Sequence, residues 1–305
     1  MCKIITMNNS ILLIFVFLII LMNPLTFPHT FVSLVEAQQQ SDVSLGSSNN
    51  LTDLLKSNSE NSSTPLENRT VNYFDNTSGY LVYPSASSLS SIKNNTSANN
   101  YTLPAVVMIH ENKGLNDNIK NMANLLGKEG YVVLAVDLFN GEVTTDQKRA
   151  SELSQSIRNN PDPAITNLKS AVEYLASLPN VNSEKIASLG WCFGGQQSLQ
   201  LALNSEDHPL AATVIYYGRL VTEPETLSKI KWPILGIFGD QDKSIPVPTV
   251  EQFEQALTKN GITNEIYIYK GVGHAFANPS GENYAPNETK GAWYKTLSFL
   301  NKYVK

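Results

Sequence analysis

Short, almost continuously apolar runs alternate with amphipathic segments along most of this 305-residue chain after residue 100. The apolar runs are rich in β-branched and aromatic residues and have the length of strands. They lie at residues 105–110, 131–137, 185–190, 212–217, 234–238 and 265–269. Strands that are apolar almost throughout are typical of a parallel sheet covered by helices on both faces.

The segments between these runs have the pattern of amphipathic helices. They lie at residues 116–129, 146–157, 163–178, 196–203, 248–259 and 290–303. Two shorter runs, at residues 71–74 and 80–84, predict an antiparallel hairpin, and a polar loop follows at residues 85–100. The alternation of strands and helices predicts one doubly wound α/β domain over residues 71–305, with no second domain and no internal repeat.

The N-terminus has a different pattern. After Lys3, residues 11–22 form an unbroken apolar run, which suits the apolar core of a signal peptide and falls short of the ~20 residues that cross a bilayer. Residues 35–37, with sequence VEA, resemble a small-residue cleavage site. We therefore expect residues 1–37 to be a signal peptide, with an uncleaved membrane anchor as the alternative, and the protein to be secreted or held at the cell surface.

Residues 38–70 are rich in Ser, Asn, Gln and Thr and contain few large apolar side chains. Such a segment cannot bury enough surface to offset the entropy of ordering, so it is predicted to be a flexible tether. Acceptor triplets for N-glycosylation occur at Asn50, Asn61, Asn68, Asn76, Asn94, Asn95, Asn100 and Asn287. Their density behind an export signal favours a glycosylated surface, although an Asn- and Ser-rich composition also produces triplets by chance.

Composition narrows the classes of function. The formal net charge is -5 and no basic stripe occurs, which argues against a nucleic-acid partner. The segment HENKG at His110 lacks the second histidine of a zinc-binding HExxH motif, and no phosphate-binding GxxxxGK loop is present, so no metal or cofactor is expected. Because Cys2 falls in the predicted signal peptide, Cys192 is expected to be the single thiol of the mature protein.

Cys192 lies in the sequence GWCFGG, between a predicted strand and a predicted helix. A nucleophile elbow has this context, with serine at the centre of its G-x-S-x-G pattern. Glycines at positions 190 and 194 fit a strained turn in which a side chain would collide with the neighbouring strand or helix. The same turn also suits a buried cysteine that packs as a small hydrophobic residue, so the turn alone leaves both interpretations open.

Two later strand ends carry the groups that a thiol nucleophile needs. Asp240 and Asp242 follow one strand and His274 follows the next, which gives the order Cys, Asp, His of an α/β-hydrolase triad. An imidazole takes the proton from the thiol, and an acid orients that imidazole. Asp242 is the preferred acid because it lies further from its strand, with Asp240 as the alternative. His110, directly after the first core strand, is a weaker candidate for the base and could equally be a core histidine.

Five motifs together resemble the dienelactone hydrolase family of α/β-hydrolases, over the chain from residue 71 onward. They are HENKGLN at His110, GWCFGG at Gly190, YYG at Tyr216, GDQDKSIP at Gly239 and GHAFAN at Gly273. The resemblance implies an α/β-hydrolase fold with a mainly parallel sheet. It also implies hydrolysis of a small-molecule carboxylic ester or lactone through a thioester acyl-enzyme.

The same resemblance assigns roles to individual residues. It implies that Cys192, Asp242 and His274 form the triad, and that Glu111 contacts the resting cysteine and helps to activate it when substrate arrives. A loop carboxylate that caps the following helix is the alternative for Glu111. Backbone amides of Asn112 and Phe193 are expected to form the oxyanion hole.

The substrate pocket departs from the family pattern. Four aromatic residues flank the motifs and are candidates for an apolar pocket wall, with the core as the alternative: Trp191, Phe193, Tyr217 and Phe276. Family members that act on dienelactone hold its carboxylate with arginines. Those positions are occupied here by Gly141 or Glu142 and by Asn278, and Ala275 replaces a serine.

The missing arginines make a neutral ester or lactone the expected substrate. Two other functions stay open from the sequence. One is a peptide or thioester hydrolase on the same fold, and the other is a non-catalytic surface binding protein. The oligomeric state does not follow from the sequence, and residues 11–22 leave a membrane tether open.

Overall fold

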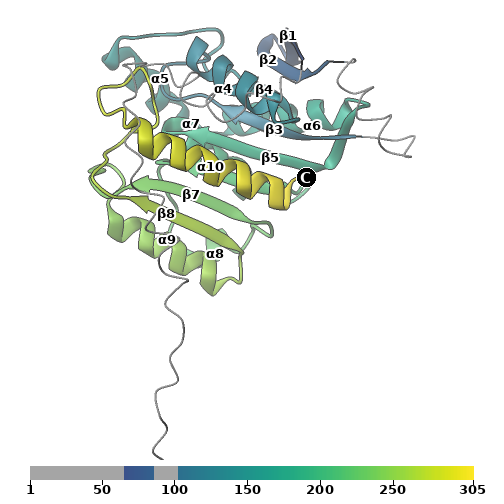
Figure 1. Ribbon diagram of the computed structural model, residues 1–305. Coiled ribbons are helices and arrows are strands. Elements are labelled where there is room, and N and C mark those ends of the chain that lie inside the picture. Colours follow the sequence, from purple (N-terminus) through teal and green to yellow (C-terminus); the bar gives the residue numbers. More distant parts are fainter. Residues whose placement is uncertain (1–64, 86–101) are drawn as a thin grey trace, which may run out of the picture. The chain divides into compact units, whose positions relative to one another are not determined.

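A computed structural model describes residues 65–85 and 102–305 of the protein (Figure 1). The predicted signal peptide, its alternative as an anchor, nearly all of the predicted tether and the loop at residues 86–100 lie outside the described residues. Among the helices that are described, none combines the length and the apolar character needed to cross a membrane.

Eight strands form a single sheet in the order β1-β2-β4-β3-β5-β6-β7-β8. The strands are β1 (Leu66–Phe74), β2 (Thr77–Pro84), β3 (Leu103–Ile109), β4 (Val132–Val136), β5 (Val181–Trp191), β6 (Ala212–Tyr216), β7 (Ile234–Gly239) and β8 (Asn264–Tyr269). All pairs from β4 through β8 are parallel, whereas β1 and β2 pair antiparallel and β2 joins β4 antiparallel. The six predicted core strands and the hairpin before them are therefore confirmed, and with them the α/β-hydrolase fold.

The hairpin strand β1 begins earlier than the composition predicts. Leu66 pairs with Pro84, so the expected domain boundary at residue 71 falls inside β1. The side chains of residues 67–70 are exposed, which explains why this part of the strand has the composition of a tether. Backbone pairing with β2 orders an edge strand without requiring apolar side chains on it.

Seven helices are found in the described part of the chain, six before the last strand and one, α10, after it. They are α4 (Asp117–Lys128), α5 (Gln147–Asn159), α6 (Asp162–Ser177), α7 (Phe193–Leu203), α8 (Pro224–Leu227), α9 (Val247–Lys259) and α10 (Pro286–Tyr303). Six of these helices match the amphipathic segments of the sequence. The helix α8 was not predicted, because a single turn is too short to show a helical period.

The central strands β3, β4, β6 and β7 are buried on both faces, which is why they are apolar at successive positions. Along β3, Val106 and Met108 pack in the cluster formed with α4 and α10. Val107 and Ile109 point the other way, into the cluster formed with α6, α7 and α9. Figure 1 shows α10 lying across one face of the sheet.

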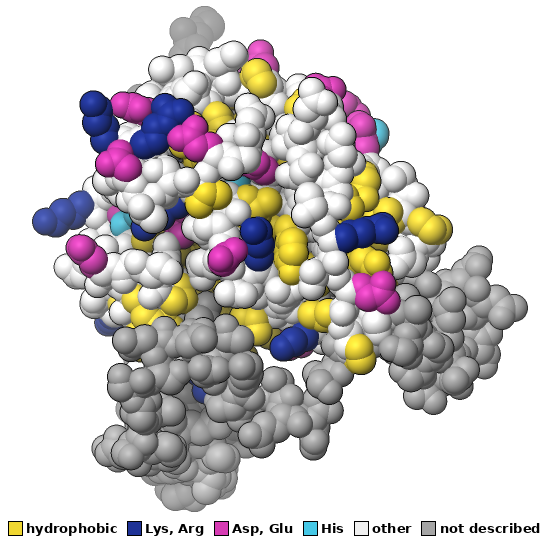
Figure 2. Space-filling view, turned by 90° about the horizontal axis from the view of Figure 1, so that it is seen from above, with side chains coloured by type: hydrophobic (Ala, Val, Ile, Leu, Met, Phe, Trp, Pro, Cys, Tyr) yellow, Lys and Arg dark blue, Asp and Glu magenta, His cyan; other side chains and the backbone are white. Residues whose placement is uncertain are grey.

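Charged side chains are interspersed on the outer surface. Figure 2 shows acidic and basic groups alternating over the visible face, with no continuous basic stripe. Three of the predicted glycosylation acceptors lie in the described part, at Asn68, Asn76 and Asn287, and all three are exposed. The residues that carry the candidate chemistry lie elsewhere, in the loops that follow β3, β5, β7 and β8.

Candidate active site

Cys192 forms the turn between β5 and α7. Its backbone has φ 55° and ψ -115°, a left-handed conformation that a non-glycine residue keeps only when its surroundings enforce it. The Cys192 amide donates to the carbonyl oxygen of Tyr216 at 2.9 Å, and its own carbonyl accepts from the amide of Gln196 at 3.1 Å. Neighbouring strand and helix thus hold the strained residue, and its side chain is only partly buried.

The glycines around Cys192 let three elements approach closely. A Cβ atom on Gly190 would lie 2.1 Å from the carbonyl oxygen of Gly194. A Cβ atom on Gly194 would lie 2.3 Å from the carbonyl oxygen of Ile109, at the end of β3. Any side chain at these two positions would therefore collide with the backbone of a neighbouring element, as the sequence predicts. Only glycine fits there.

The structure brings Cys192, His274 and Asp242 together. Nε2 of His274 lies 3.0 Å from Sγ of Cys192, and Nδ1 of His274 lies 2.7 Å from Oδ2 of Asp242. The other carboxylate oxygen, Oδ1, accepts from the backbone amides of Ser244 at 2.8 Å and Ile245 at 3.1 Å. The carboxylate is therefore fixed on one side by its own loop and faces the imidazole on the other.

Burial and charge act against one another at this contact. Burial lowers the pKa of His274, but hydrogen bonds and charges of Asp242 and Cys192 outweigh that effect and raise the pKa to about 10. Burial likewise raises the pKa of Asp242, but the hydrogen bond and charge of His274, with two backbone amides, bring the pKa below its usual value. The imidazole is thus stabilised in its protonated form, between a carboxylate and a sulfur atom.

Asp240 and His110 occupy other roles. Oδ1 of Asp240 accepts from the amide of Gly271 at 2.7 Å, so this acid caps a turn and Asp242 is the acid that contacts the histidine. His110 is fully buried, and Nε2 accepts from the amide of Leu138 at 3.1 Å. The proton therefore belongs on Nδ1, which contacts the carbonyl oxygen of Glu111 at 2.5 Å. Burial lowers the pKa of His110, which makes it a neutral core histidine.

Glu111 is buried beside the site, with 4% of its surface exposed. Burial raises the pKa of its carboxyl group to about 7, against the opposing charges of His274 and Lys113. The side-chain amide of Asn278 donates to Oε2 of Glu111, and no hydrogen bond joins Glu111 to Cys192 among the described residues. Glu111 does not cap the next helix either, because Asn116 caps α4.

A cavity of about 190 Å³ opens beside Cys192 and His274. Asn112 and Phe193, the two residues expected to supply the oxyanion hole, both line it. No acceptor is found for either backbone amide within the described ranges, so both N–H groups are free to bind a ligand. Phe193 is also the first residue of α7, where the helix dipole favours negative charge.

Of the predicted pocket aromatics, the structure places Phe193 and Tyr217 in the cavity wall, and the ring centroid of Tyr217 lies 5.3 Å from that of His274. Trp191 is not at the wall and packs on Tyr216, with ring centroids 5.4 Å apart. Phe276 is completely buried behind Tyr217, with ring centroids 5.6 Å apart. Both residues belong to the core on the α10 side of the sheet, which was the alternative for these aromatic residues.

One wall of the cavity comes from α5, which the sequence did not connect with the site. Ser151, Ser154 and Arg158 line the cavity and lie three and four positions apart, on one face of the helix. Arg219, two residues after Tyr217, completes the group. The sequence shows that these three residues share one face of a helix. It does not show that this face of α5 points toward Cys192.

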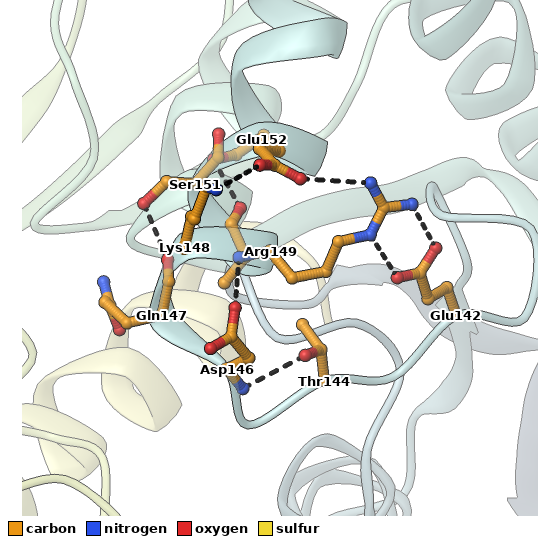
Figure 3. A network of polar contacts seen from close by, with 10 residues as sticks. Glu142, Thr144, Asp146, Gln147, Lys148, Arg149, Ser151 and Glu152 are labelled. Atoms are coloured by element: carbon orange, nitrogen blue, oxygen red, sulfur yellow. Dashed lines mark hydrogen bonds and ion pairs between the residues drawn. The ribbon is translucent and has the colours of Figure 1, made fainter.

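The start of α5 is fixed to the loop after β4, as Figure 3 shows. The guanidinium of Arg149 binds both carboxylate oxygens of Glu142, at 2.6 and 2.8 Å, and also contacts Glu152 at 3.3 Å. Asp146 caps the helix by accepting from the Arg149 amide at 2.6 Å. Glu142 thus holds α5 in place and is not among the residues that line the cavity.

Comparisons with known proteins identify the family of the chain. The model of the dienelactone hydrolase family matches residues 93–304. A protein of Saccharolobus solfataricus, provisionally named a carboxymethylenebutenolidase, is 30% identical over 235 residues, which cover 66% of this chain and 90% of that protein. A Bradyrhizobium protein, provisionally named a 2-oxo-3-(5-oxofuran-2-ylidene)propanoate lactonase, is 28% identical over 213 residues, covering 66% of this chain and 85% of that protein.

A solved structure shares the fold. The crystal structure of a dienelactone hydrolase-like promiscuous phosphotriesterase from metagenomic libraries superimposes with a TM-score of 0.68 at 22% identity. The superposition covers 79% of this chain and 99% of that one. The matched region of the family model includes the loops that carry the thiol, the acid and the imidazole.

Proposed function

The chain belongs to the dienelactone hydrolase family, and we propose that it hydrolyses small carboxylic esters or lactones with Cys192 as the nucleophile. The names of its relatives, a carboxymethylenebutenolidase and a lactonase, support this class of reaction. The observation that carries the choice of nucleophile is the contact of Cys192 Sγ with His274 Nε2 at 3.0 Å, on a histidine that also contacts Asp242 at 2.7 Å.

In the first half of the proposed reaction, the thiolate of Cys192 attacks the carbonyl carbon of the ester. The carbonyl oxygen gains a negative charge, and the backbone amides of Asn112 and Phe193 donate hydrogen bonds to it. The carbon–oxygen bond to the alcohol then breaks, and Nε2 of His274 gives its proton to the departing alkoxide. The acyl group is left on sulfur as a thioester, and in a lactone the alcohol stays attached to that acyl group.

In the second half, a water molecule attacks the thioester carbonyl while His274, now neutral, takes a proton from it. The carbon–sulfur bond breaks, the acid product leaves, and the thiolate and imidazolium are restored. Asp242 keeps Nε2 directed at the sulfur and stabilises the charged imidazole in both halves. The pair is thus ready for another cycle without an outside proton carrier.

Glu111 is a positioning residue in this proposal. The side-chain amide of Asn278 binds its carboxyl group, and the sulfur of Cys192 is contacted by His274. In this arrangement no hydrogen bond joins Glu111 to Cys192, so the expected contact with the resting cysteine stays a prediction. The arrangement described here is therefore the one in which Cys192 is paired for reaction.

The test is a panel of phenyl esters, lactones, a peptide anilide and an alkyl thioester, assayed with wild-type protein and with Cys192→Ala and Cys192→Ser. We expect turnover of esters or lactones by the wild type, and none by Cys192→Ala with its circular dichroism and Tm retained. Cys2→Ser is the matched control and keeps full activity. Wild-type rates in Cys192→Ala contradict the mechanism. Cleavage of only the peptide or the thioester selects the hydrolase alternative, and no turnover at all selects the binding protein.

A further inference from the structure

The peptide bond between Glu111 and Asn112 carries a proposed oxyanion donor at one end and a buried contact at the other. Its N–H is the amide of Asn112, a residue that lines the cavity beside Cys192. Its carbonyl oxygen belongs to Glu111 and contacts Nδ1 of His110 at 2.5 Å. The C=O and N–H of a trans peptide point in opposite directions. The contact with His110 therefore directs the Asn112 amide away from the imidazole.

The proton that makes this contact is fixed by the opposite nitrogen of the His110 ring. Nε2 accepts from the amide of Leu138 at 3.1 Å, so the neutral ring carries its proton on Nδ1 and donates it to the Glu111 carbonyl. The Asp137 carboxylate lies 3.9 Å from Nε2 and accepts from two backbone amides of its own loop. Burial lowers the pKa of His110, which keeps the ring neutral. The loop after β4 thus sets both the tautomer and the direction of the donor.

The same imidazole packs against the second residue of the proposed oxyanion hole. The His110 ring stacks on Phe193, with ring centroids 5.9 Å apart and 27° between the ring planes. Phe139 meets the imidazole edge-on at 4.7 Å and lies 5.3 Å from Phe193. His110 is fully buried within this cluster of three rings. Because buried side chains are close-packed, the imidazole cannot turn without displacing Phe193.

A turn supplies a second and longer contact to the Glu111 carbonyl. The amide of Gly114 donates to this oxygen at 3.4 Å, at a residue with φ 85°. That distance exceeds the usual range for an N–H to oxygen hydrogen bond, about 2.7–3.2 Å. The imidazole contact is the shorter of the two, so loss of the His110 donor leaves the peptide with only the weaker restraint of the turn.

We propose that His110 is a positioning residue for the oxyanion hole. Its Nδ1–H holds the Glu111 carbonyl so that the Asn112 amide stays directed at the developing oxyanion, and its ring supports Phe193. The inference rests on the proposed function and extends it beyond the triad, to a histidine that touches neither the substrate nor the sulfur. A donor held in place in advance needs no reorganisation when charge develops on the ester oxygen. A carbonyl that accepts a hydrogen bond also polarises its peptide, which strengthens the N–H of that peptide as a donor.

Two substitutions separate the two hydrogen bonds of the His110 ring. The amide group of asparagine reaches the position of Nδ1, so His110→Asn keeps a donor to the Glu111 carbonyl and loses the acceptor for Leu138. The amide group of glutamine reaches the position of Nε2, so His110→Gln keeps that acceptor and loses the donor. Tyr73→Phe is the matched control for stability. It removes a buried hydroxyl that donates to Asn167 Oδ1 at 2.7 Å, a contact outside the oxyanion hole.

Steady-state kinetics with a phenyl ester and thermal unfolding are measured for the wild type and the three variants. His110→Gln should lower kcat by about a hundredfold and keep KM within about threefold, because the misplaced amide acts on the transition state. His110→Asn should keep kcat within about fivefold of the wild type, although it also loses one buried hydrogen bond and lowers Tm. Tyr73→Phe should lower Tm and keep kcat. Equal losses of kcat in His110→Asn and His110→Gln, or wild-type kcat in His110→Gln, overturn the proposal.

A structural measurement separates this inference from the proposed reaction. Crystal structures of Cys192→Ala combined with His110→Gln or with His110→Asn need no turnover. We expect the Glu111–Asn112 peptide to rotate in the protein with His110→Gln and to keep its wild-type direction in the protein with His110→Asn. A peptide that keeps its direction in both proteins overturns the positioning role even if esters are cleaved. Rotation with His110→Gln alone supports that role even if the wild type cleaves no ester, a result that refutes only the proposed function.

Discussion

The side-chain amide of Asn278 donates a hydrogen bond to the carboxyl group of Glu111, across 167 residues of sequence. The contact joins the loop after β3 to the loop that carries His274. It is buried on both sides, since Glu111 is 4% exposed and Asn278 is 8% exposed. A buried carboxyl group that accepts from one neutral donor loses much of its solvation when it ionises. This loss raises the pKa of Glu111 to about 7.

The substitution Glu111→Gln should therefore change stability in a pH-dependent way. The folded protein holds this proton up to about pH 7, whereas the unfolded chain releases it near the ordinary value of 4.5. The stability that the protonated group contributes is complete below pH 4.5 and is lost as pH rises through about 7. Glu111→Gln has no ionisable group at this position and does not lose stability in this way. The free energy of unfolding of the variant minus that of the wild type should therefore increase between pH 4.5 and pH 7, by at most about 3 kcal/mol.

Urea unfolding of the two proteins at pH 4.5, 6 and 8 measures this difference. A difference between Glu111→Gln and the wild type that is constant across the three pH values contradicts the interpretation. It would mean that Glu111 ionises in the folded state as readily as in the unfolded chain.

Tyr216 and Tyr217 are adjacent and both buried, but their hydroxyl groups differ in hydrogen bonding. Replacing each with phenylalanine compares the contribution of the two hydroxyl groups to the free energy of unfolding. The hydroxyl of Tyr216 contacts Thr296 Oγ1 at 2.6 Å, whereas the buried hydroxyl of Tyr217 makes no hydrogen bond of normal geometry in the described part of the chain and has only the backbone of Ala277 nearby as a weak partner. Tyr216→Phe should lower the free energy of unfolding by about 1 kcal/mol, and Tyr217→Phe should raise it by about 1 kcal/mol. Thermal and urea unfolding of both variants measure the two signs. Equal destabilisation by both substitutions would show that Tyr217 does have a partner.

Asp242 and Asp240 lie two residues apart in one loop. Substituting each of them in turn distinguishes a role in catalysis from a role in the local structure of the loop. Asp242→Asn removes the carboxylate that contacts His274 Nδ1 and should lower kcat by at least about a hundredfold. Asp240→Asn keeps a side-chain oxygen that can accept from the Gly271 amide and should leave kcat within a few-fold of the wild type. Steady-state kinetics with a phenyl ester provides the comparison. The reverse order of effects would make Asp240 the acid of the triad.

The position of the thiol, acid and imidazole could be predicted from the sequence because each follows a strongly apolar strand. Parallel strands bring their carboxyl ends to one edge of a sheet, so the chain order of Cys192, Asp242 and His274 was enough to expect them together. The glycines at 190 and 194 added a mechanical reason for the turn. The contact distances agree with that expectation.

The cavity wall could not be predicted in the same way. Trp191 and Phe276 sit next to catalytic motifs, but both pack in the core on the α10 side of the sheet. Arg158 lies 34 positions before Cys192, on a helix whose cavity-facing side is set by the Glu142–Arg149 pair and not by the helical period. Motif positions locate the reacting atoms, whereas packing decides which side chains surround the substrate.

The central claim is that the acyl group is carried on the sulfur of Cys192, and rapid acid quenching followed by mass spectrometry tests it most directly. Wild-type protein is mixed with 4-nitrophenyl hexanoate, quenched within the first turnover and digested. We predict a hexanoyl adduct on the peptide that contains Cys192, removed by neutral hydroxylamine and absent from Cys192→Ala. An adduct on another residue, or steady turnover of the ester by Cys192→Ala at the wild-type rate, would contradict the account.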